Sequence, residues 1–320
     1  MMARISIIGE GMLELSQDGA QAARLSYGGD TLNTAIYLAR LGLAPDFVSA
    51  MGRDPYSKEL LDAWQAEGIE IDHVLLHPSR LPGLYSIRTG AGGERSFFYW
   101  RGKSAMRDFF NMDGHASALA SAAGSDWLYF SGITLSLFTE AEREALYALA
   151  KDIRARGGEV VFDPNYRPEG WTSSEAARRS IDRIGEHVRV ALPTLDDEAA
   201  LYGETDADVA LARWRERGTA LVVLKCGAGG AVVQAPGETA IRVPAQAVDH
   251  PVDTTGAGDS FNAAFLNGLV NGLRPADAAA AGNALAAAVI LHRGAIIPRE
   301  AMPASVSGRR TGPAGGPAPI

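Results

Sequence analysis

The chain has 320 residues, and 47% of them are hydrophobic, enough for the core of one large α/β domain or one domain with an insertion. A formal net charge of −8, without any cluster of Lys and Arg interleaved with aromatic residues, argues against a nucleic-acid partner. The single cysteine, Cys226, excludes an internal disulfide and a cysteine-based metal site. The first residues lead straight into a strand pattern without a signal peptide, and no apolar run is long enough to cross a bilayer. We therefore expect a cytoplasmic protein that does not contact the membrane.

The first polar cluster lies at the start of a helix. An apolar run at residues 5–8 predicts a buried strand, and Gly28-Gly29-Asp30-Thr31-Leu32-Asn33 then opens a helix. Asp30 or Thr31 alone would satisfy the helix start as an N-cap. Because capping needs only one such side chain, the surplus, which includes Asn33, favours a polyol ligand.

A strand at residues 47–50 and a helix at 55–67 precede a change of pattern. Apolar and polar residues alternate from Tyr85 to Thr89 and again from Arg95 to Arg101, with Gly90–Gly93 between them, which predicts an antiparallel hairpin. Such an excursion within a βα pattern predicts a small lid sheet. Tyr99 and Arg101 share one face of it and suit a sugar ring and an anion. Phe97 lies on the same face, and packing on the body of the protein would explain it equally well, but an arginine on a buried face needs a partner.

From residue 126 onward, strands and helices alternate, which predicts a parallel sheet covered by helices. Strands are expected at 127–130, 159–162, 188–192, 220–225 and 231–234, and helices at 139–156, 174–184, 206–217 and 275–291. Asn165 and Arg167 follow a strand on a loop that two prolines keep irregular. Because ligands bind at this edge of open parallel sheets, Arg167 is expected to meet a ligand rather than to be a plain surface arginine.

Two further stretches point to a nucleotide. The acidic helix start that follows Thr194 either complements the helix dipole or holds Mg²⁺ through water by way of Asp197. Lys225 then precedes a glycine-rich hairpin, Gly227-Ala228-Gly229-Gly230, which can lie over a nucleotide.

The most informative stretch is Asp253-Thr254-Thr255-Gly256-Ala257-Gly258-Asp259. Its glycines precede an apolar four-residue period, Phe261 to Leu273, which places them at a helix N-terminus where free N–H groups favour an anion. A carboxylate in that first turn would repel a phosphate unless it served another purpose, such as taking a proton from an attacking hydroxyl. An ordinary glycine turn with a first-turn Asp is the competing interpretation. The stretch is neither a Walker A loop nor a full dinucleotide fingerprint.

These motifs together resemble the ribokinase-like (PfkB-type) carbohydrate kinases, over residues 3 to 303. The run Gly28-Gly29-Asp30 through Asn33 is similar to the family's N-terminal motif, and Asp253 through Phe261 is similar to its C-terminal motif. The resemblance implies a three-layer α/β/α domain at residues 1–306, with a mostly parallel central sheet. It also implies a small β-sheet lid from strands around 10–30 and 83–102. The tail at 307–320 is rich in Gly, Pro and Ala and is expected to be disordered.

Within the family, the chain is similar to the bacterial 2-dehydro-3-deoxygluconate kinases, through Arg80–Tyr85, Glu94–Arg101, Asn165–Pro168 and Arg293–Pro303. This resemblance implies ATP-dependent phosphorylation of a sugar acid at O6, with Asp259 as the base. It places Gly28, Gly29, Asp30, Asn33, Tyr85, Tyr99, Arg101 and Arg167 against the substrate, because arginine forks match a carboxylate. It places Asn165, Thr194, Lys225, Gly227, Ala228, Gly230 and Asn283 near ATP, with the amides of Gly256, Ala257 and Gly258 at the γ-phosphoryl group.

The metal ligands are less sharply defined by the resemblance. Mg²⁺ would accompany ATP, and a monovalent cation such as K⁺ would use Asp253 and nearby carbonyls. Where many relatives carry Asn-x-x-Glu, this chain has Thr194-x-x-Asp197, and a slip of one residue would substitute Glu198.

Two other functions stay open at this stage. A fructokinase or ribokinase acting on a neutral sugar would use the same fold, and a non-catalytic sugar-acid sensor would keep the binding residues but would not need Asp259. A nucleotide-dependent oxidoreductase is set aside because the dinucleotide fingerprint is incomplete. The exposed edge of the lid hairpin predicts a homo-oligomer joined through the lid.

Overall fold

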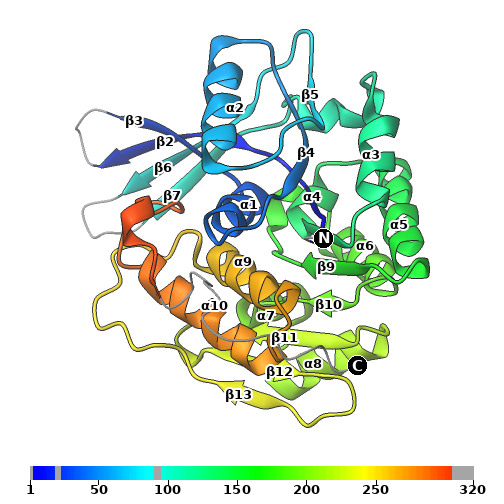
Figure 1. The fold of residues 1–320 in the computed structure, drawn as a ribbon, viewed down its shortest axis with the longest axis vertical. Helices are drawn as coiled ribbons and strands as arrows, with labels where there is room; N and C mark the ends of the chain where they lie inside the picture. The colour runs from blue at the N-terminus through cyan, green and yellow to red at the C-terminus, as the bar shows by residue number, and fades with distance from the viewer. Residues whose placement is uncertain (1–2, 19–22, 90–94, 305–320) are drawn as a thin grey trace.

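A computed structural model describes residues 3–18, 23–89 and 95–304, so the expected Gly90–Gly93 turn and the 307–320 tail lie outside the described residues. A large sheet runs through the centre (Figure 1). Its strands are β1 (Ile5–Ile8), β4 (Asp46–Met51), β5 (Val74–Leu76), β8 (Trp127–Ser131), β9 (Glu159–Asp163), β10 (Val190–Ala191), β11 (Leu221–Lys225), β12 (Ala231–Gln234) and β13 (Ile241–Val243). Their order is β13-β12-β11-β10-β9-β8-β1-β4-β5.

The central strands are paired in parallel, as the alternating pattern predicts. Antiparallel pairing occurs only where β12 joins β11 and β13, at one end of the described sheet. Strands β1, β4, β8, β9, β10 and β11 therefore all end at the same edge. In open parallel sheets that edge is where ligands bind.

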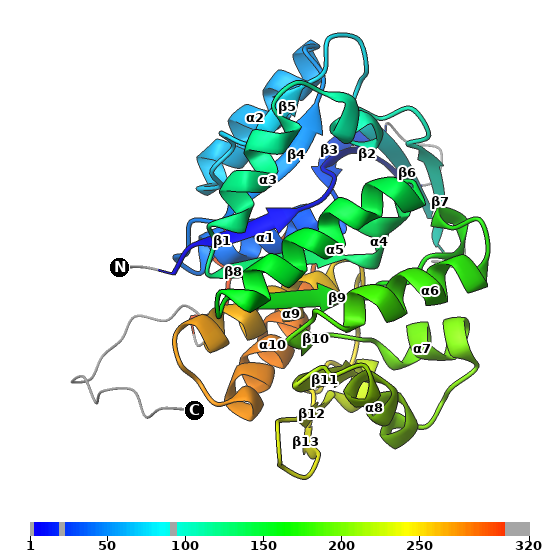
Figure 2. The same cartoon turned by 90° about the vertical axis from the view of Figure 1, so that its right-hand side faces the viewer.

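Helices cover both faces of this sheet (Figure 2). One layer holds α1 (Asp30–Arg40), α2 (Pro55–Glu67), α9 (Ala257–Val270) and α10 (Pro275–Val289), and the other holds α3 (His115–Ala123), α4 (Gly132–Ser136), α5 (Glu140–Ala155), α6 (Ser174–Gly185), α7 (Leu195–Tyr202) and α8 (Ala207–Glu216). Trp64 and Trp214 are fully buried in opposite layers. Burying each such side chain stabilises the fold by about 2 kcal/mol or more. The expected three-layer α/β/α class is confirmed.

A second, smaller sheet projects from the body (Figure 1). It contains β2 (Met12–Asp18), β3 (Arg24–Gly28), β6 (Gly83–Thr89) and β7 (Arg95–Trp100), in the order β3-β2-β6-β7. β6 and β7 form the predicted antiparallel hairpin, and β2 adds to β6 in parallel. β7 is an edge strand, and its residues 97–100 are between 42% and 60% exposed.

Several bounds differ from those predicted, mainly at the ends of elements. The strand expected at 188–192 forms ladder pairs only at Val190 and Ala191. The helix expected to reach Leu273 ends at Val270, because Gly272 adopts a left-handed φ of 78° that stops it. The sequence pattern does not predict the short helices α3 and α4. α3 consists almost entirely of Ala and Ser and so lacks an apolar period, and α4 spans a single turn. No helix within the described ranges is long and apolar enough to span a membrane.

Candidate active site

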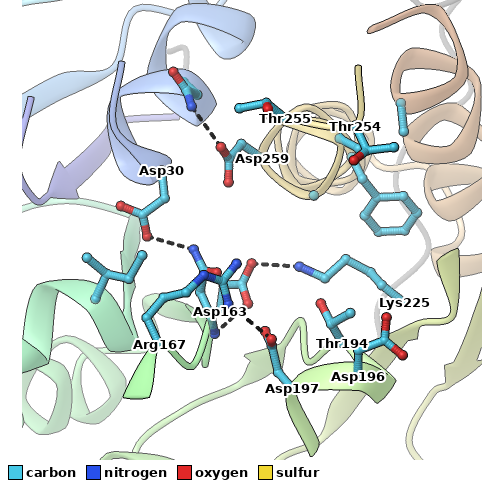
Figure 3. A pocket seen from close by; sticks show the side chains of 18 of the residues that line it. Asp30, Asp163, Arg167, Thr194, Asp196, Asp197, Lys225, Thr254, Thr255 and Asp259 are labelled. Carbon is cyan, nitrogen blue, oxygen red and sulfur yellow. Dashed lines mark hydrogen bonds and ion pairs between the residues drawn. The ribbon is translucent and has the colours of Figure 1, made fainter. Parts of the chain in front are cut away.

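A cavity of about 1770 Å³ lies at the edge where the parallel strands end. Its floor comes from residues that follow β9, β10 and β11, one wall from the start of α9, and its roof from the lid sheet. Figure 3 shows the labelled side chains converging on it. Most residues predicted for substrate or nucleotide binding line this one cavity, although they come from eight separate stretches of the chain.

The start of α9 is shaped for an anion. Gly256 is the N-cap residue, with a φ of 76°, and a Cβ atom there would lie 2.8 Å from Ala295, so only glycine fits. The Ala257 amide turns back to the Thr254 carbonyl at 3.2 Å. The amides of Gly256 and Gly258 are therefore the better placed donors, because the first turn of a helix leaves its N–H groups without intrahelical acceptors.

Asp259 lies deep in the cavity, where solvent still reaches part of it. The Asn33 side-chain amide donates to its carboxylate at 2.8 Å. Burial, followed by the nearby charge of Asp30, raises the pKa of Asp259 from its ordinary value of 3.8 to about 7. A carboxyl with this pKa can accept a proton near neutral pH, as a general base must.

A buried polar cluster at the cavity joins Lys225 to Asp163, Asn262 and Tyr129. The Lys225 ammonium donates to the Asp163 carboxylate at 2.6 Å and to the Asn262 carbonyl oxygen at 3.1 Å. The Asn262 amide donates to Asp163 at 2.6 Å and to the Tyr129 hydroxyl at 3.1 Å. A Cβ atom placed on Gly258 would lie only 3.7 Å from the Lys225 ammonium, so this cation sits beside the anion-binding turn.

The predicted Asn165 is held in an unusual conformation. It is the one non-glycine residue with positive φ, 34°, among the described residues. Its backbone amide donates to Asp163 at 3.1 Å, and its side-chain amide donates to Asp30 at 3.0 Å across the cavity (Figure 3). Backbone strain of this kind is stored where the surrounding contacts fix it, and here it joins Asp30 to the buried cluster.

The lid contributes aromatic rings. Tyr85 donates a short hydrogen bond to the buried Glu14, and its ring stacks on Tyr99 at 6.2 Å between centroids. Both tyrosines line the cavity, as predicted. Gly28 does not line it but backs it, because a Cβ atom there would collide with the Tyr85 hydroxyl at 2.3 Å.

The two predicted arginines already have carboxylate partners within the chain. Arg101 lies 2.6 Å from the buried Glu10, but its Nε and Nη2 make no aligned hydrogen bond with the described residues. Arg167 pairs with Asp197 at 3.0 Å (Figure 3). A guanidinium carries five N–H donors, so each arginine can hold a second carboxylate that enters the cavity.

A third arginine in the cavity was missed by the sequence reasoning. Arg107 donates from Nε to the Arg101 carbonyl and from Nη1 to the Leu137 carbonyl, each at 3.1 Å. It forms no ion pair among the residues that the structure describes, and burial lowers its pKa. The only signal in the sequence was its position six residues after Arg101, which does not show that the two side chains share a cavity.

Of the predicted metal ligands, some line the cavity and others lie outside it. Asp197 and Thr194 line the cavity, whereas Glu198 is buried and holds Arg213 at 2.6 Å and the Trp214 indole at 2.9 Å. The structure thus supports Asp197 over Glu198 in the register of this motif. Asp253 does not line the cavity, since its carboxylate accepts the amides of Thr255 at 2.9 Å and Gly294 at 2.5 Å.

The remaining nucleotide candidates surround the far end of the cavity. It is lined by Lys225, Gly227, Ala228, Gly230 and Asn283, and also by residues 245–249, which the sequence reasoning did not include. The Asn283 amide donates to the carbonyls of Val243 at 3.1 Å and Pro244 at 3.0 Å, so it shapes the start of that loop.

The chain is similar over nearly its whole length to known carbohydrate kinases. The family model described as pfkB family carbohydrate kinase matches residues 2–302. The chain belongs to this family. It is 42% identical over 310 residues to the 2-dehydro-3-deoxygluconokinase of Escherichia coli strain K12, covering 95% of this chain and 100% of that protein. It is 43% identical over 307 residues to the enzyme of the same name from Dickeya dadantii strain 3937, covering 94% and 98%.

Among solved structures, the PfkB protein from Polaromonas sp. JS666 matches with a TM-score of 0.80 at 27% identity, covering 93% of this chain and 98% of that one. The likeness supports the ribokinase-like arrangement of sheet, helices and lid. The resemblance implied by the two glycine motifs is thereby confirmed for the chain as a whole.

Proposed function

We propose that the protein transfers the γ-phosphoryl group of ATP to O6 of 2-dehydro-3-deoxy-D-gluconate. The observation that carries this proposal is the position of Asp259, a carboxyl with a pKa of about 7 in the same helical turn as the Gly256–Gly258 anion site. Relatives more than 40% identical over nearly the whole chain carry the name of this activity. Arg101, Arg107 and Arg167 all line this cavity and can offer N–H donors to the substrate carboxylate, a group that a neutral sugar lacks.

In this mechanism, Asp259 takes the proton of the O6 hydroxyl as that oxygen attacks phosphorus. Asn33 holds the carboxylate in position at 2.8 Å. The amides of Gly256 and Gly258 and the Lys225 ammonium stabilise the negative charge on the transferred group, because they are fixed before it arrives. The lid tyrosines cover the sugar, and the arginines bind its carboxylate.

The residues present fit ATP and Mg²⁺. The glycine-rich turn after Lys225 allows close approach to a nucleotide, and Thr194, Asp196 and Asp197 offer oxygen atoms on the same wall (Figure 3). No group of three His, Cys, Asp or Glu side chains that could hold a metal occurs among the described residues. Mg²⁺, which neutralises phosphate charge when bound, would therefore be held mainly by the triphosphate and water.

The position of the new phosphate tests the proposal. Phosphorus NMR of the product should show a phosphomonoester coupled to methylene protons, because O6 is the primary hydroxyl. A phosphomonoester on a secondary carbon would show that Asp259 faces a different hydroxyl.

The pH dependence follows from the raised pKa of Asp259. Because the base must be ionised, kcat/KM for the sugar acid should fall about tenfold per pH unit below pH 7 and level off above it. Initial rates from pH 5.5 to 8.5, with Mg²⁺ and ATP saturating, would check this. A profile that stays flat down to pH 5.5 would contradict a base with this pKa.

Arg167→Lys should separate acid from neutral substrates. Lysine keeps the charge but loses the planar fork, so we expect KM for the sugar acid to rise about 10- to 100-fold with a smaller change in kcat. Arg215→Lys, on the exposed surface of α8, is the matched control. If kcat/KM for fructose fell by the same factor, Arg167 would not be recognising the carboxylate.

Asp253 is the proposed ligand of a monovalent cation. Asp253 joins the turn before α9 to the loop at Gly294, and a K⁺ ion bound there would stiffen the anion site; rates in KCl against NaCl would test this.

The exposed aromatic edge of β7 suits a dimer formed through the lids. We expect a dimer at micromolar concentration in sedimentation, and a monomer would refute that assembly. We place the enzyme in the cytoplasm, where its donor ATP is found.

A further inference from the structure

A second cavity of about 540 Å³ lies beside the first, outside the predicted active site. It is bordered by the turn from Ser136 to Glu140, by Gly170 to Thr172, and by the facing sides of α5 and α6. Its volume is in the range of small-molecule sites. None of the sequence motifs and no step of the proposed reaction uses it.

The charge lining this cavity is mostly positive. Four arginines border it, Arg107, Arg143, Arg179 and Arg183, against two glutamates, Glu140 and Glu169. Only Arg183 forms an ion pair among the described residues, with Glu144 on the rim. Three guanidiniums in one cavity thus lack a carboxylate partner in a protein whose overall charge is −8.

Arg143 is held with part of its guanidinium toward the cavity. Its Nε donates to the Leu135 carbonyl at 2.8 Å, its Nη1 donates to the Ser180 hydroxyl at 3.0 Å, and the group lies 4.7 Å from the centre of the Trp171 ring. Burial lowers its pKa, as expected for a cation that is desolvated without a carboxylate. These contacts fix the cation while leaving its Nη2 for a ligand.

Two helices also begin at this cavity. Glu140 is the first residue of α5, and Ala176 lies in the first turn of α6. The positive ends of both helix dipoles therefore add to the field of the arginines. Cations on several sides, together with two helix starts, match an anion that has several acceptor oxygens.

We propose that this second cavity binds the phosphate group of a small phosphorylated metabolite. A phosphate carries close to two negative charges and three acceptor oxygens, which several guanidiniums can share. The volume exceeds what inorganic phosphate needs, so a phosphate ester fills the cavity better.

The two cavities share a wall made of Arg107, Ser136, Glu169 and Gly170. This wall is tightly packed, since a Cβ atom on Gly170 would lie 2.7 Å from the Ser136 hydroxyl. Two anions on either side of Arg107 repel each other and compete for one cation. Resting on the proposed function, we infer that the bound phosphate raises KM for the sugar acid, and by linkage the sugar acid weakens phosphate binding.

Calorimetric titration of the full chain with inorganic phosphate and with 6-phosphogluconate tests the site, and it needs no turnover. We expect Arg179→Glu to weaken binding of both probes at least tenfold, because it reverses an exposed charge whose side chain makes no hydrogen bond or ion pair among the described residues. Arg215→Glu makes the same charge change on α8, away from both cavities, and should change binding less than twofold.

Arg143→Lys provides a second variant, which keeps the charge and removes the fork. Weaker binding in both Arg179→Glu and Arg143→Lys supports the site, and tighter binding of the ester than of inorganic phosphate identifies an ester as the ligand. Equal binding of the two probes identifies free phosphate. Binding that is unchanged in both variants, or undetectable with either probe at 10 mM in the wild type, on the order of the weakest specific sites, overturns the proposal.

Steady-state kinetics test separately whether a ligand in the second cavity weakens binding of the sugar acid in the first. The 6-phosphogluconate probe should raise KM for the sugar acid without changing kcat in the wild type and in Arg215→Glu, but not in Arg179→Glu. Equal inhibition of Arg179→Glu would mean that the probe acts in the Asp259 cavity, and would overturn the coupling.

Discussion

Replacing Asp259 by asparagine should lower kcat by about 10³-fold or more, because the amide cannot take the proton of the attacking hydroxyl. Asparagine has nearly the same shape, and the Asn33 amide can still donate to its oxygen, so substrate binding should change much less than kcat. Single-turnover rates with saturating sugar acid and ATP would measure the effect. A loss of less than tenfold would contradict the role of Asp259 as the base.

The same variant carries its own test of folding. The folded pKa of Asp259 lies above its ordinary value of 3.8, so ionisation of this group costs stability as the pH rises through about 7. A rise in pKa from 3.8 to about 7 corresponds to about 4 kcal/mol, and solvent that reaches part of the carboxyl lowers this figure. Removing the carboxyl should therefore raise the free energy of unfolding at pH 8 by on the order of 1–3 kcal/mol. An inactive variant with a higher Tm at pH 8 and an unchanged Tm near pH 4 is the expected combination.

Replacing Lys225 by methionine should lower kcat by about 10²- to 10³-fold, because a fixed cation beside the phosphoryl group is lost. The substitution also leaves Asp163 as an unpaired charge in the core, where both side chains are less than 10% exposed. Breaking such a buried pair costs about 3–5 kcal/mol, so a fall in activity alone could come from unfolding.

The double variant Lys225→Met with Asp163→Asn separates the two effects. Asparagine removes the unpaired charge, so stability measured by urea unfolding should recover most of the loss. We expect kcat to stay low in this stable double variant. Recovery of kcat together with stability would show that Lys225 serves only to neutralise Asp163.

Parts of this site could be predicted from sequence because they depend on neighbouring residues. The turn at Gly256 requires positive φ, and Asp259 follows at a fixed spacing in the first turn of α9, so one short stretch of sequence specifies both the anion site and the acid. The same holds for the start of α1 at Asp30 and for the hairpin of β6 and β7.

The pairings between distant residues could not be predicted in this way. Asp163 meets Lys225 only because the parallel strands β9 and β11, which helices separate in the sequence, end at one edge of the large sheet. Glu10 meets Arg101 because the residues that follow β1 lie against the end of the lid strand β7. The choice between Asp197 and Glu198 depended on which face of α7 turns toward the cavity, which a shift of one residue reverses. Arg107 enters the cavity from a 3₁₀ helix that has no periodic signal.

The central claim is that this cavity selects a sugar acid over a neutral sugar. The most direct test compares kcat/KM for ATP-dependent ADP release with 2-dehydro-3-deoxy-D-gluconate, fructose and ribose under identical conditions. Because Arg101, Arg107 and Arg167 line the cavity and can offer N–H donors to a carboxylate, which a neutral sugar lacks, we expect the sugar acid to be preferred by about 10³-fold or more, in line with sites built around a polar group of the substrate. Comparable or higher kcat/KM for fructose or ribose would contradict the account.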